Sequence, residues 1–330
     1  MPYKDTDYLA LSAALHARQT QLLSRDRRDA LIDAPSAADT LRLLAQSGYG
    51  EAAAADAAAL EQLLTRARSA LFDELSSAVP ERRIVDVFRL KYDYHNAKVL
   101  LKARKSAQEA QHLLIGCGRY APAVMEQAFA RDDYRDLSPL LREAIGKAAE
   151  VLTQSADAQA ADLILDRACY AEMCALAQES VSRFLSTYVA LNIDAVNLRT
   201  TVRAARMGRE REFLLSALLD GGTISPSRLA AAQSGTIAAL IASGAFSEAG
   251  APAAAAMAGE KSLTTFEKAC DNAINSYLSA ARRTPFGEEV VIGYLHAKEA
   301  ELTAVRTIVS GKLAGLAPEL IRERLRDTYL

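Results

Sequence analysis

The spacing of the apolar residues limits what this chain can fold into. Between Leu295 and Leu320, apolar residues follow one another at intervals of seven, three, four, four, three and four. These intervals match the 3.6-residue period of an amphipathic helix, and similar spacing recurs along most of the chain. Alternating segments typical of strands are missing, and the good helix formers Ala, Leu, Arg and Glu dominate. The sequence therefore predicts an all-α fold.

Residues that end helices are scarce, with 16 Gly and 9 Pro among 330 residues. A chain of this length usually exceeds one core, so we expect two or three domains. Proline costs little in a first helical turn, and three prolines are expected there: Pro35, Pro122 and Pro226. Clusters of Gly, Pro, Asp or Ser predict breaks between helices at four places: 33–36, 116–122, 221–226 and 249–252.

The overall charge excludes several classes of protein. Lys and Arg number 39 and Asp and Glu 41, so no general attraction to phosphate backbones exists, and a nucleic-acid-binding protein is disfavoured.

Neither CxxC nor HExxH spacing occurs, so we expect no structural zinc. Residues 1–18 lack a signal-peptide core, and the uncharged run 229–247 is too weakly apolar to span a bilayer. We expect a cytosolic chain with reduced thiols.

Two short motifs recur with a period of about 100 residues. The first consists of an apolar residue, a polar residue, a cation and an alanine, at 64–67, 165–168 and 266–269. The second fits DxxNx[KR]xxx[KR], with two full copies and a degenerate third copy: Asp93, Asn96, Lys98 and Lys102, then Asp194, Asn197, Arg199 and Arg203, then Glu301 and Arg306. Units of this length are domains rather than solenoid repeats. We predict three similar helical-bundle domains, at 1–115, 116–220 and 221–330.

The polar residues of the second motif are candidates for a structural role. Asp93 and Asn96, like Asp194 and Asn197, are spaced i,i+3 beside apolar stripes. Buried polar side chains need hydrogen-bond partners, so we expect these pairs, with Glu301 and Arg306 in the third copy, to tie helices together within each unit. A site for a partner protein is the alternative.

Cations gather near the ends of the first two repeats. Residues 81–109 carry eight cations against four anions, and residues 199–211 carry five against one. Cations commonly accumulate at helix C-termini and on solvated faces. The alternative is a surface for acidic groups of a partner, with five candidate residues: Lys98, Lys102, Arg199, Arg203 and Arg206.

One acidic cluster suggests an enzyme. Residues 132–136 read DDYRD, and Asp132, Asp133 and Asp136 have the spacing by which all-α prenyl-diphosphate enzymes hold magnesium. Such enzymes also need a second acidic cluster and an aromatic cavity, whereas this chain has no Trp, few aromatics and no matching cluster. A solvated helix start with acids near its N-terminus is the favoured interpretation.

No other pattern indicates catalysis or a cofactor. The GxxxxGK[ST] phosphate loop is absent, so we expect no nucleotide site, no cofactor and no small-molecule substrate. His296 and Glu299 stand one helical turn apart and could hold a metal, but a di-iron bundle needs several such pairs. An ordinary polar helix face is the favoured interpretation.

The C-terminal segment 285–330 contains residues in a distinctive order: Pro285, Gly287, Tyr294, Lys298, Glu299, Ala300, Glu301, Arg306, Gly311, Lys312, Gly315, Leu316, Ile321, Arg322, Leu325 and Tyr329. With this order the segment strongly resembles the C subunit of the V-type and archaeal-type rotary ATPases, which is called the d subunit in eukaryotes. Segments beginning at Lys91 and Tyr188 are also similar to repeated segments of that family, so the resemblance covers nearly the whole chain. These matches are scaffold patterns rather than a catalytic signature.

The resemblance implies an all-helical funnel of three similar domains about a pseudo-threefold axis. It implies a non-catalytic central-stalk rotor subunit that couples the central axle to the membrane proteolipid ring for proton or sodium transport. The implied partners are the axle subunits and the ring, and the implied position is peripheral, on the cytoplasmic face of the membrane, through protein contacts. We expect a monomer in isolation. The alternatives are an all-α isoprenoid-diphosphate enzyme and an unrelated helical adaptor protein.

The missing phosphate loop predicts that the isolated chain binds neither ATP nor magnesium diphosphate. Calorimetric titration with either ligand should give no binding heat, because no backbone cradle is expected for the phosphate oxygens. Tight binding of either ligand would contradict this prediction and would favour the isoprenoid-diphosphate enzyme.

Overall fold

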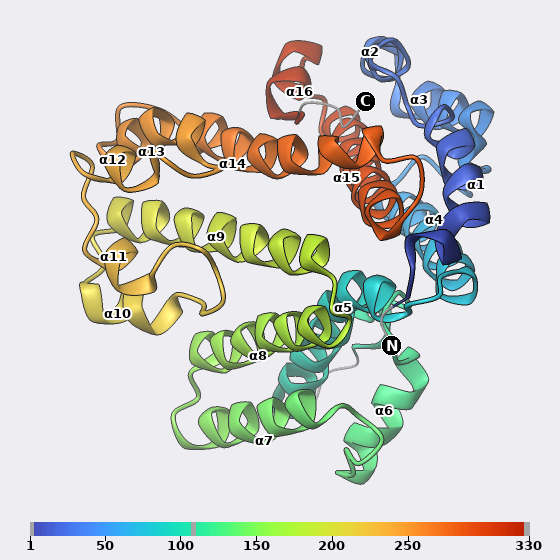
Figure 1. Ribbon diagram of the computed structural model, residues 1–330. Coiled ribbons are helices and arrows are strands. Elements are labelled where there is room, and N and C mark those ends of the chain that lie inside the picture. Colours follow the sequence, from blue (N-terminus) through green and yellow to red (C-terminus); the bar gives the residue numbers. More distant parts are fainter. Residues whose placement is uncertain (1–2, 107–109, 327–330) are drawn as a thin grey trace.

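Helices joined by short connections make up the described part of the chain (Figure 1). The computed structural model describes residues 3–106 and 110–326, and no strand occurs within those ranges, which confirms the all-α prediction. The α-helices are α1 (Leu9–Gln19), α2 (Arg25–Asp33), α3 (Ala37–Leu44), α4 (Ala57–Ala78), α5 (Arg83–Ser106), α6 (Pro122–Arg131), α7 (Pro139–Gln154), α8 (Ala158–Glu179), α9 (Arg183–Arg206), α10 (Arg211–Ala217), α11 (Pro226–Ala230), α12 (Ile237–Ile241), α13 (Gly250–Met257), α14 (Leu263–Leu278), α15 (Glu288–Leu313) and α16 (Pro318–Arg324). The 3₁₀ helices are η1 (Asp5–Tyr8), η3 (Gln111–Leu113), η4 (Ser247–Ala249) and η5 (Ser279–Arg283), and η2 (Ala45–Tyr49) is a π-helical turn.

Side-chain caps fix where many of these helices begin. A Ser or Asp immediately before the helix accepts a hydrogen bond from the backbone N–H three residues later, which satisfies one of the donors left free at a helix start. Such caps precede α2, α3, α4, α7, α8 and α9: Ser24, Ser36, Asp56, Ser138, Asp157 and Ser182.

Two of the three prolines expected in a first helical turn occupy one. Pro122 begins α6 and Pro226 begins α11. The prediction for Pro35 is wrong, because the capping side chain of Ser36 starts α3 one residue later and leaves Pro35 outside the helix. Three predicted breaks separate helices as expected: 33–36, 116–122 and 221–226.

The fourth predicted break, at 249–252, is not a gap. Here η4 continues directly into α13, because Ala249 and Gly250 both keep right-handed helical backbone angles. Pro252 is accommodated in the first turn of α13, where its missing N–H costs little.

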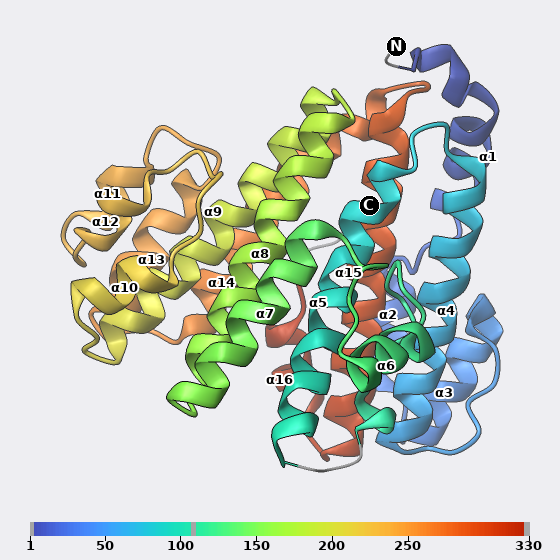
Figure 2. The same cartoon turned by 90° about the horizontal axis from the view of Figure 1, so that it is seen from below.

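Three pairs of long helices form the frame of the molecule: α5 with α8, α9 with α14, and α15 with α4. In each pair one helix carries the first repeated motif and the other carries the second. The apolar residues that open the first motif, Leu64 on α4, Leu165 on α8 and Phe266 on α14, are all fully buried. The second motif lies on α5, α9 and α15. Each pair therefore joins helices from two consecutive repeats, and α15 closes the series by packing on α4 (Figure 2).

The apolar cores follow this pairing. One core is shared by α5, α6, α7 and α8. A second lies among α2, α3, α4, α15 and α16, so the two ends of the chain form one bundle. The third and largest takes in α9 to α14 and the N-terminal halves of α5 and α15. The predicted domain boundaries near 115 and 220 lie in connections between helices, and the division at 1–115, 116–220 and 221–330 stays a prediction.

The C-terminal helix α16 is held by one close contact and one ion-pair cluster. Ile321 is fully buried, and a Cβ on Gly311 of α15 would stand 2.8 Å from its Cγ1. Glycine at 311 therefore lets α16 approach α15. Arg322 also reaches α2, where its guanidinium lies 2.6 Å from Asp33 and 3.4 Å from Asp29.

Replacement of Gly311 by alanine should therefore destabilise the protein. Overpacking of this kind costs about 1–3 kcal/mol of unfolding free energy. Gly146→Ala is the matched control, since Gly146 also lies inside a helix but has open space at its Cβ position. The control should stabilise by up to about 1 kcal/mol through helix propensity. Urea unfolding measures both variants, and equal effects would contradict the proposed close contact.

Candidate partner-binding cavity

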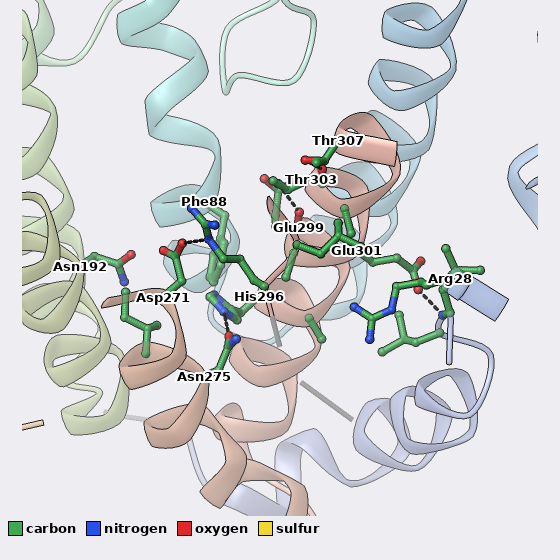
Figure 3. Close-up of a pocket in the computed structure, with 18 of the residues that line it drawn as sticks. Arg28, Phe88, Asn192, Asp271, Asn275, His296, Glu299, Glu301, Thr303 and Thr307 are labelled. Atoms are coloured by element: carbon green, nitrogen blue, oxygen red, sulfur yellow. Dashed lines mark hydrogen bonds and ion pairs between the residues drawn. The ribbon is translucent and has the colours of Figure 1, made fainter. Parts of the chain in front are cut away.

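The long helices α5, α9 and α15 meet around a cavity of about 420 Å³ (Figure 3). One aromatic side chain from each helix joins them. Phe88 of α5 stacks on Tyr188 of α9 with ring centroids 5.3 Å apart, and the Tyr188 and His296 rings pack in a T shape with centroids 5.7 Å apart. Further lining residues come from α5, α9, α14, α15 and the end of the chain: Lys91, Asn192, Arg199, Asp271, Asn275, Glu299, Glu301, Thr303, Thr307, Arg324 and Arg326.

Glu299, in the cavity wall, forms ion pairs with cations from two other helices. Its carboxylate accepts from Arg68 Nε of α4 at 2.7 Å, from Lys91 Nζ of α5 at 2.5 Å and from the Tyr92 hydroxyl at 3.1 Å. Burial by itself would raise the pKa of Glu299, but Lys91 and Arg68 outweigh that effect and hold the pKa below its ordinary value. The ionised carboxylate thus ties α15 to both α4 and α5.

His296 is held as a neutral ring rather than as a metal ligand. Its Nε2 lies 2.8 Å from Asn275 Oδ1 and its Nδ1 lies 3.3 Å from the Tyr188 hydroxyl. Burial lowers the pKa of His296 to about 4. The Glu299 carboxylate that would share a metal is already bound by two cations. Across residues 3–106 and 110–326, no group of three or more His, Cys, Asp or Glu side chains is placed to hold a metal.

Asn96 and Asn197 bind the connections that follow their helices in the same way. Asn96 Nδ2 donates to the carbonyl of Ile115 and its Oδ1 accepts from the same residue's N–H, both at 2.9 Å. Asn197 makes the same two bonds with Leu219, both at 2.8 Å. Both asparagines are fully buried. Each therefore pairs one backbone N–H and one C=O of a loop.

The aspartates one turn earlier on each helix grip the same loops. Asp93 accepts from the Tyr120 N–H at 3.2 Å, and Asp194 accepts from the N–H groups of Thr223 and Ile224 at 3.0 Å. The loop lies so close that a Cβ on Gly118 would stand 2.2 Å from Asp93 Oδ1, and a Cβ on Gly222 equally close to Asp194 Oδ1. Only glycine fits this approach, so the two loops are built alike.

Arg119 balances the negative charge of Asp93, whereas Asp194 accepts hydrogen bonds from the uncharged groups of Thr223 and Ile224. Burial raises the pKa of Asp93 to about 6, although Arg119 Nε, 2.8 Å from its carboxylate, opposes the rise. Arg119 also reaches Glu172 of α8 at 2.9 Å, which extends the link between α5 and α8. Burial likewise raises the pKa of Asp194, and its hydrogen bonds from Thr223 and Ile224 offset this only in part.

The third copy of the motif connects distant parts of the chain. Glu301 on α15 is buried and accepts from the Leu23 N–H, from the Tyr49 hydroxyl and from Lys298. Arg306 pairs with Glu61 of α4 at 2.5 Å. A carboxylate of α15 thus holds a loop from the opposite end of the chain.

The structure places most of the candidate partner-surface cations in ion pairs within the chain. Lys98 and Lys102 of α5 pair with Asp166 and Asp162 of α8, at 2.5 and 2.7 Å. On the next pair of helices, Arg199 pairs with Asp271, Arg203 pairs with Glu267, and Arg206 lies 3.4 Å from the carbonyl of Lys261. Their role as a partner surface stays a prediction.

The DDxxD cluster is not at a helix start, and that interpretation is wrong. Asp132 ends α6 in a left-handed conformation with φ of 52°, which aspartate tolerates better than most residues, and Asp133 follows in the turn. Asp132 pairs with Arg104 at 2.8 Å and Asp133 with Arg135 at 2.6 Å. None of the three aspartates lines the cavity described above. Two further residues used in the sequence argument, Glu109 and Tyr329, lie outside the described residues.

Sequence reasoning missed two of the acids that pair with the motif cations. Glu61 and Asp162 are spaced by the same 101 residues as the motifs and occupy matching places on α4 and α8. Extending the repeat alignment three residues toward the N-terminus would have found them. The pairing of His296 with Asn275 has no comparable sequence signal, because it joins two helices by a single contact.

Comparison with known proteins gives the family of the chain. The model of the ATP synthase (C/AC39) subunit family matches residues 11–324. The chain is 27% identical to the C subunit of the V-type sodium ATPase of Enterococcus hirae, over 98% of this chain and 99% of that protein. It is 23% identical to the C subunit of the V-type ATP synthase of Thermus thermophilus, over 97% and 98% of the two chains. It is also 24% identical to the C subunit of the A-type ATP synthase of Methanocaldococcus jannaschii, over 96% and 86%.

The chain therefore belongs to the ATP synthase C/AC39 subunit family. It is a structural subunit of an ATPase complex rather than an enzyme by itself, and a peripheral component of that complex. Among the described helices, none combines the length and the apolar character that a membrane crossing requires.

Removal of the loop-binding side chains should cost stability. Asp194→Ala with Asn197→Ala leaves the N–H groups of Leu219, Thr223 and Ile224 without their acceptors, and each unsatisfied buried group costs about 1–3 kcal/mol. Thr187→Ala on the same helix is the control, since it removes side-chain bonds to the Arg183 carbonyl and to Tyr277 but leaves no backbone N–H without its acceptor. Denaturant unfolding should show a large loss for the double variant alone. An unchanged unfolding midpoint with weakened partner binding would instead assign the pair to an interface.

Proposed function

We propose that this chain is a central-stalk rotor subunit that couples the axle of a V/A-type ATPase to its membrane proteolipid ring. The observation that carries the proposal is the cavity at the meeting point of α5, α9 and α15, which offers a concave seat for the end of an axle. Its relatives are named as C subunits of V-type and A-type ATPases and ATP synthases, and they match along nearly their full length.

The proposal includes a funnel of three similar domains about a pseudo-threefold axis. The three matched helix pairs support it, because each pair joins a first-motif helix to a second-motif helix. In this arrangement the axle enters the cavity, and the opposite end of the subunit rests on the ring at the cytoplasmic face of the membrane. The isolated subunit is a monomer and needs no cofactor, since its task is mechanical.

Transmission of torque requires a rigid body, and the contacts around the cavity provide stiffness. We assign Asp93, Asn96, Asp194 and Asn197, and Glu301 with Arg306, to this structural role. Glu299 links three helices through two cations. Because close-packed helices transmit strain with little compression, such a body can carry rotation from axle to ring without chemistry of its own.

The five candidate cations form the proposed surface for acidic partner groups: Lys98, Lys102, Arg199, Arg203 and Arg206. Arg203 and Arg206 are its most testable members, since both side chains are exposed. Exposed charge pairs are screened over about 10 Å at 0.1 M salt, so assembly through this surface should weaken at high salt.

Removal of the subunit should separate ATP hydrolysis from ion transport. The catalytic head and axle carry the ATPase machinery, so hydrolysis should persist, whereas ATP-driven ion transport should fall to background because the rotor is no longer joined. Membranes prepared with and without the subunit measure both activities, and added wild-type subunit should restore transport. Intact pumping without the subunit would refute the coupling role. Assembly that is unaffected by Arg203→Glu and Arg206→Glu would refute only the proposed cationic surface.

A further inference from the structure

The last described residues cross from one bundle to another along the cavity. α16 is fixed to the bundle formed by the chain ends, through Ile321 and Arg322. Beyond it, Leu325 and Arg326 line the cavity. Arg326 then reaches α14, where its Nε donates to Asp271 at 2.5 Å. Leu325 and Arg326 therefore form part of the cavity wall.

The two acids that hold Arg326 lie together on α14, where Arg199 and Arg203 of α9 also pair with them. Asp271 and Glu267 are four residues apart and so project from the same side of the helix. A guanidinium nitrogen of Arg326 lies 3.8 Å from Glu267, in addition to its bond with Asp271. Asp271 is itself a lining residue of the cavity (Figure 3). A cation that enters the cavity along α14 would meet Asp271 in the wall, with Glu267 one turn away on the same helix.

Another cation can replace Arg326 in its contact with Asp271 and Glu267. The side chains of Arg326 and Asp271 keep 29% and 31% of their exposure, so the pair is half-buried and solvent reaches it. Arg199 and Arg203 of α9 also pair with Asp271 and Glu267. Loss of Arg326 therefore leaves neither acid without a cation, so its departure carries no large penalty.

We propose that Arg326 occupies the binding site of a partner cation. Glu267 and Asp271 bind a Lys or Arg side chain at the tip of the protein segment that enters the cavity, and Arg326 is displaced on entry. This inference rests on the proposed function, because the entering segment is the foot of the axle. The partner is thereby defined by its charge: its tip carries a cation where it meets α14.

The test compares two substitutions with opposite expected effects on the affinity of the full-length chain for the purified axle subunits. Arg326→Ala should tighten binding about three- to tenfold, because the competing cation is gone and a larger fraction of the chain is competent to bind. Asp271→Asn should weaken binding at least about threefold, because the acceptor for the axle cation is lost. Glu267→Gln gives the same test should Asp271→Asn fail to fold.

Lys147→Ala is the matched control. It removes one positive charge and one exposed ion pair, with Glu143, and Lys147 does not line the cavity. Axle affinity of this variant should stay within about twofold of the wild type, which excludes a general effect of net charge. The melting temperature of Arg326→Ala should stay within about 2 °C of the wild type, because Arg199 and Arg203 still pair with both acids.

A purely structural role for Arg326 would give a different pattern of axle affinities. If Arg326 only reinforced the fold, Arg326→Ala and Asp271→Asn would act in the same direction, and both would weaken axle binding. If the wild type binds the axle and Arg326→Ala leaves that affinity unchanged or lowers it, this inference is overturned. The proposed function then still stands. Absence of any binding by the wild-type chain overturns the proposed function, and this inference with it.

Discussion

Two buried asparagines determine where the chain turns and hence how its helices pack. Asn96 and Asn197 are fully buried, and an unpaired amide in such a place costs about 1–3 kcal/mol. The loop after each helix must therefore return to it and offer both an N–H and a C=O. Asp93 and Asp194 bind the same loops one turn earlier. Because each loop is fixed against its helix, the next helices start from a defined place and pack back on the same long helix.

In the third copy of the motif, the buried polar side chain also finds hydrogen-bond partners, but they come from a distant part of the chain. Glu301 of α15 holds the Leu23 N–H, and Glu299 joins α15 to Arg68 of α4 and Lys91 of α5. A bundle made of α2 to α4 with α15 and α16 is the result. Closing the chain in this way brings α5, α9 and α15 around one cavity. The proposed mechanical role depends on this closure, since an open row of bundles would bend under torque.

Much of the fold follows from local patterns, and the errors have local causes. The 3.6-residue period predicts helices because it reports a buried face, and the i,i+3 spacing of Asp194 and Asn197 indicates polar groups that need partners. The pattern misplaces Pro35 because a capping serine one residue later competes for the helix start. It misplaces Asp132 because charge alone does not distinguish a helix start from a left-handed helix end.

The sequence by itself determined the helical class, the repeated motifs and, through resemblance, the family. Each of these is written in residues that lie close together along the chain. Only the tertiary structure decided which helices pair, because the complementary faces of α5 and α8, or of α15 and α4, are contributed by different repeats. It also decided that Lys98 and Arg199 meet Asp166 and Asp271 within the chain. The cavity likewise appears only when three long helices converge, since no single segment contains its walls.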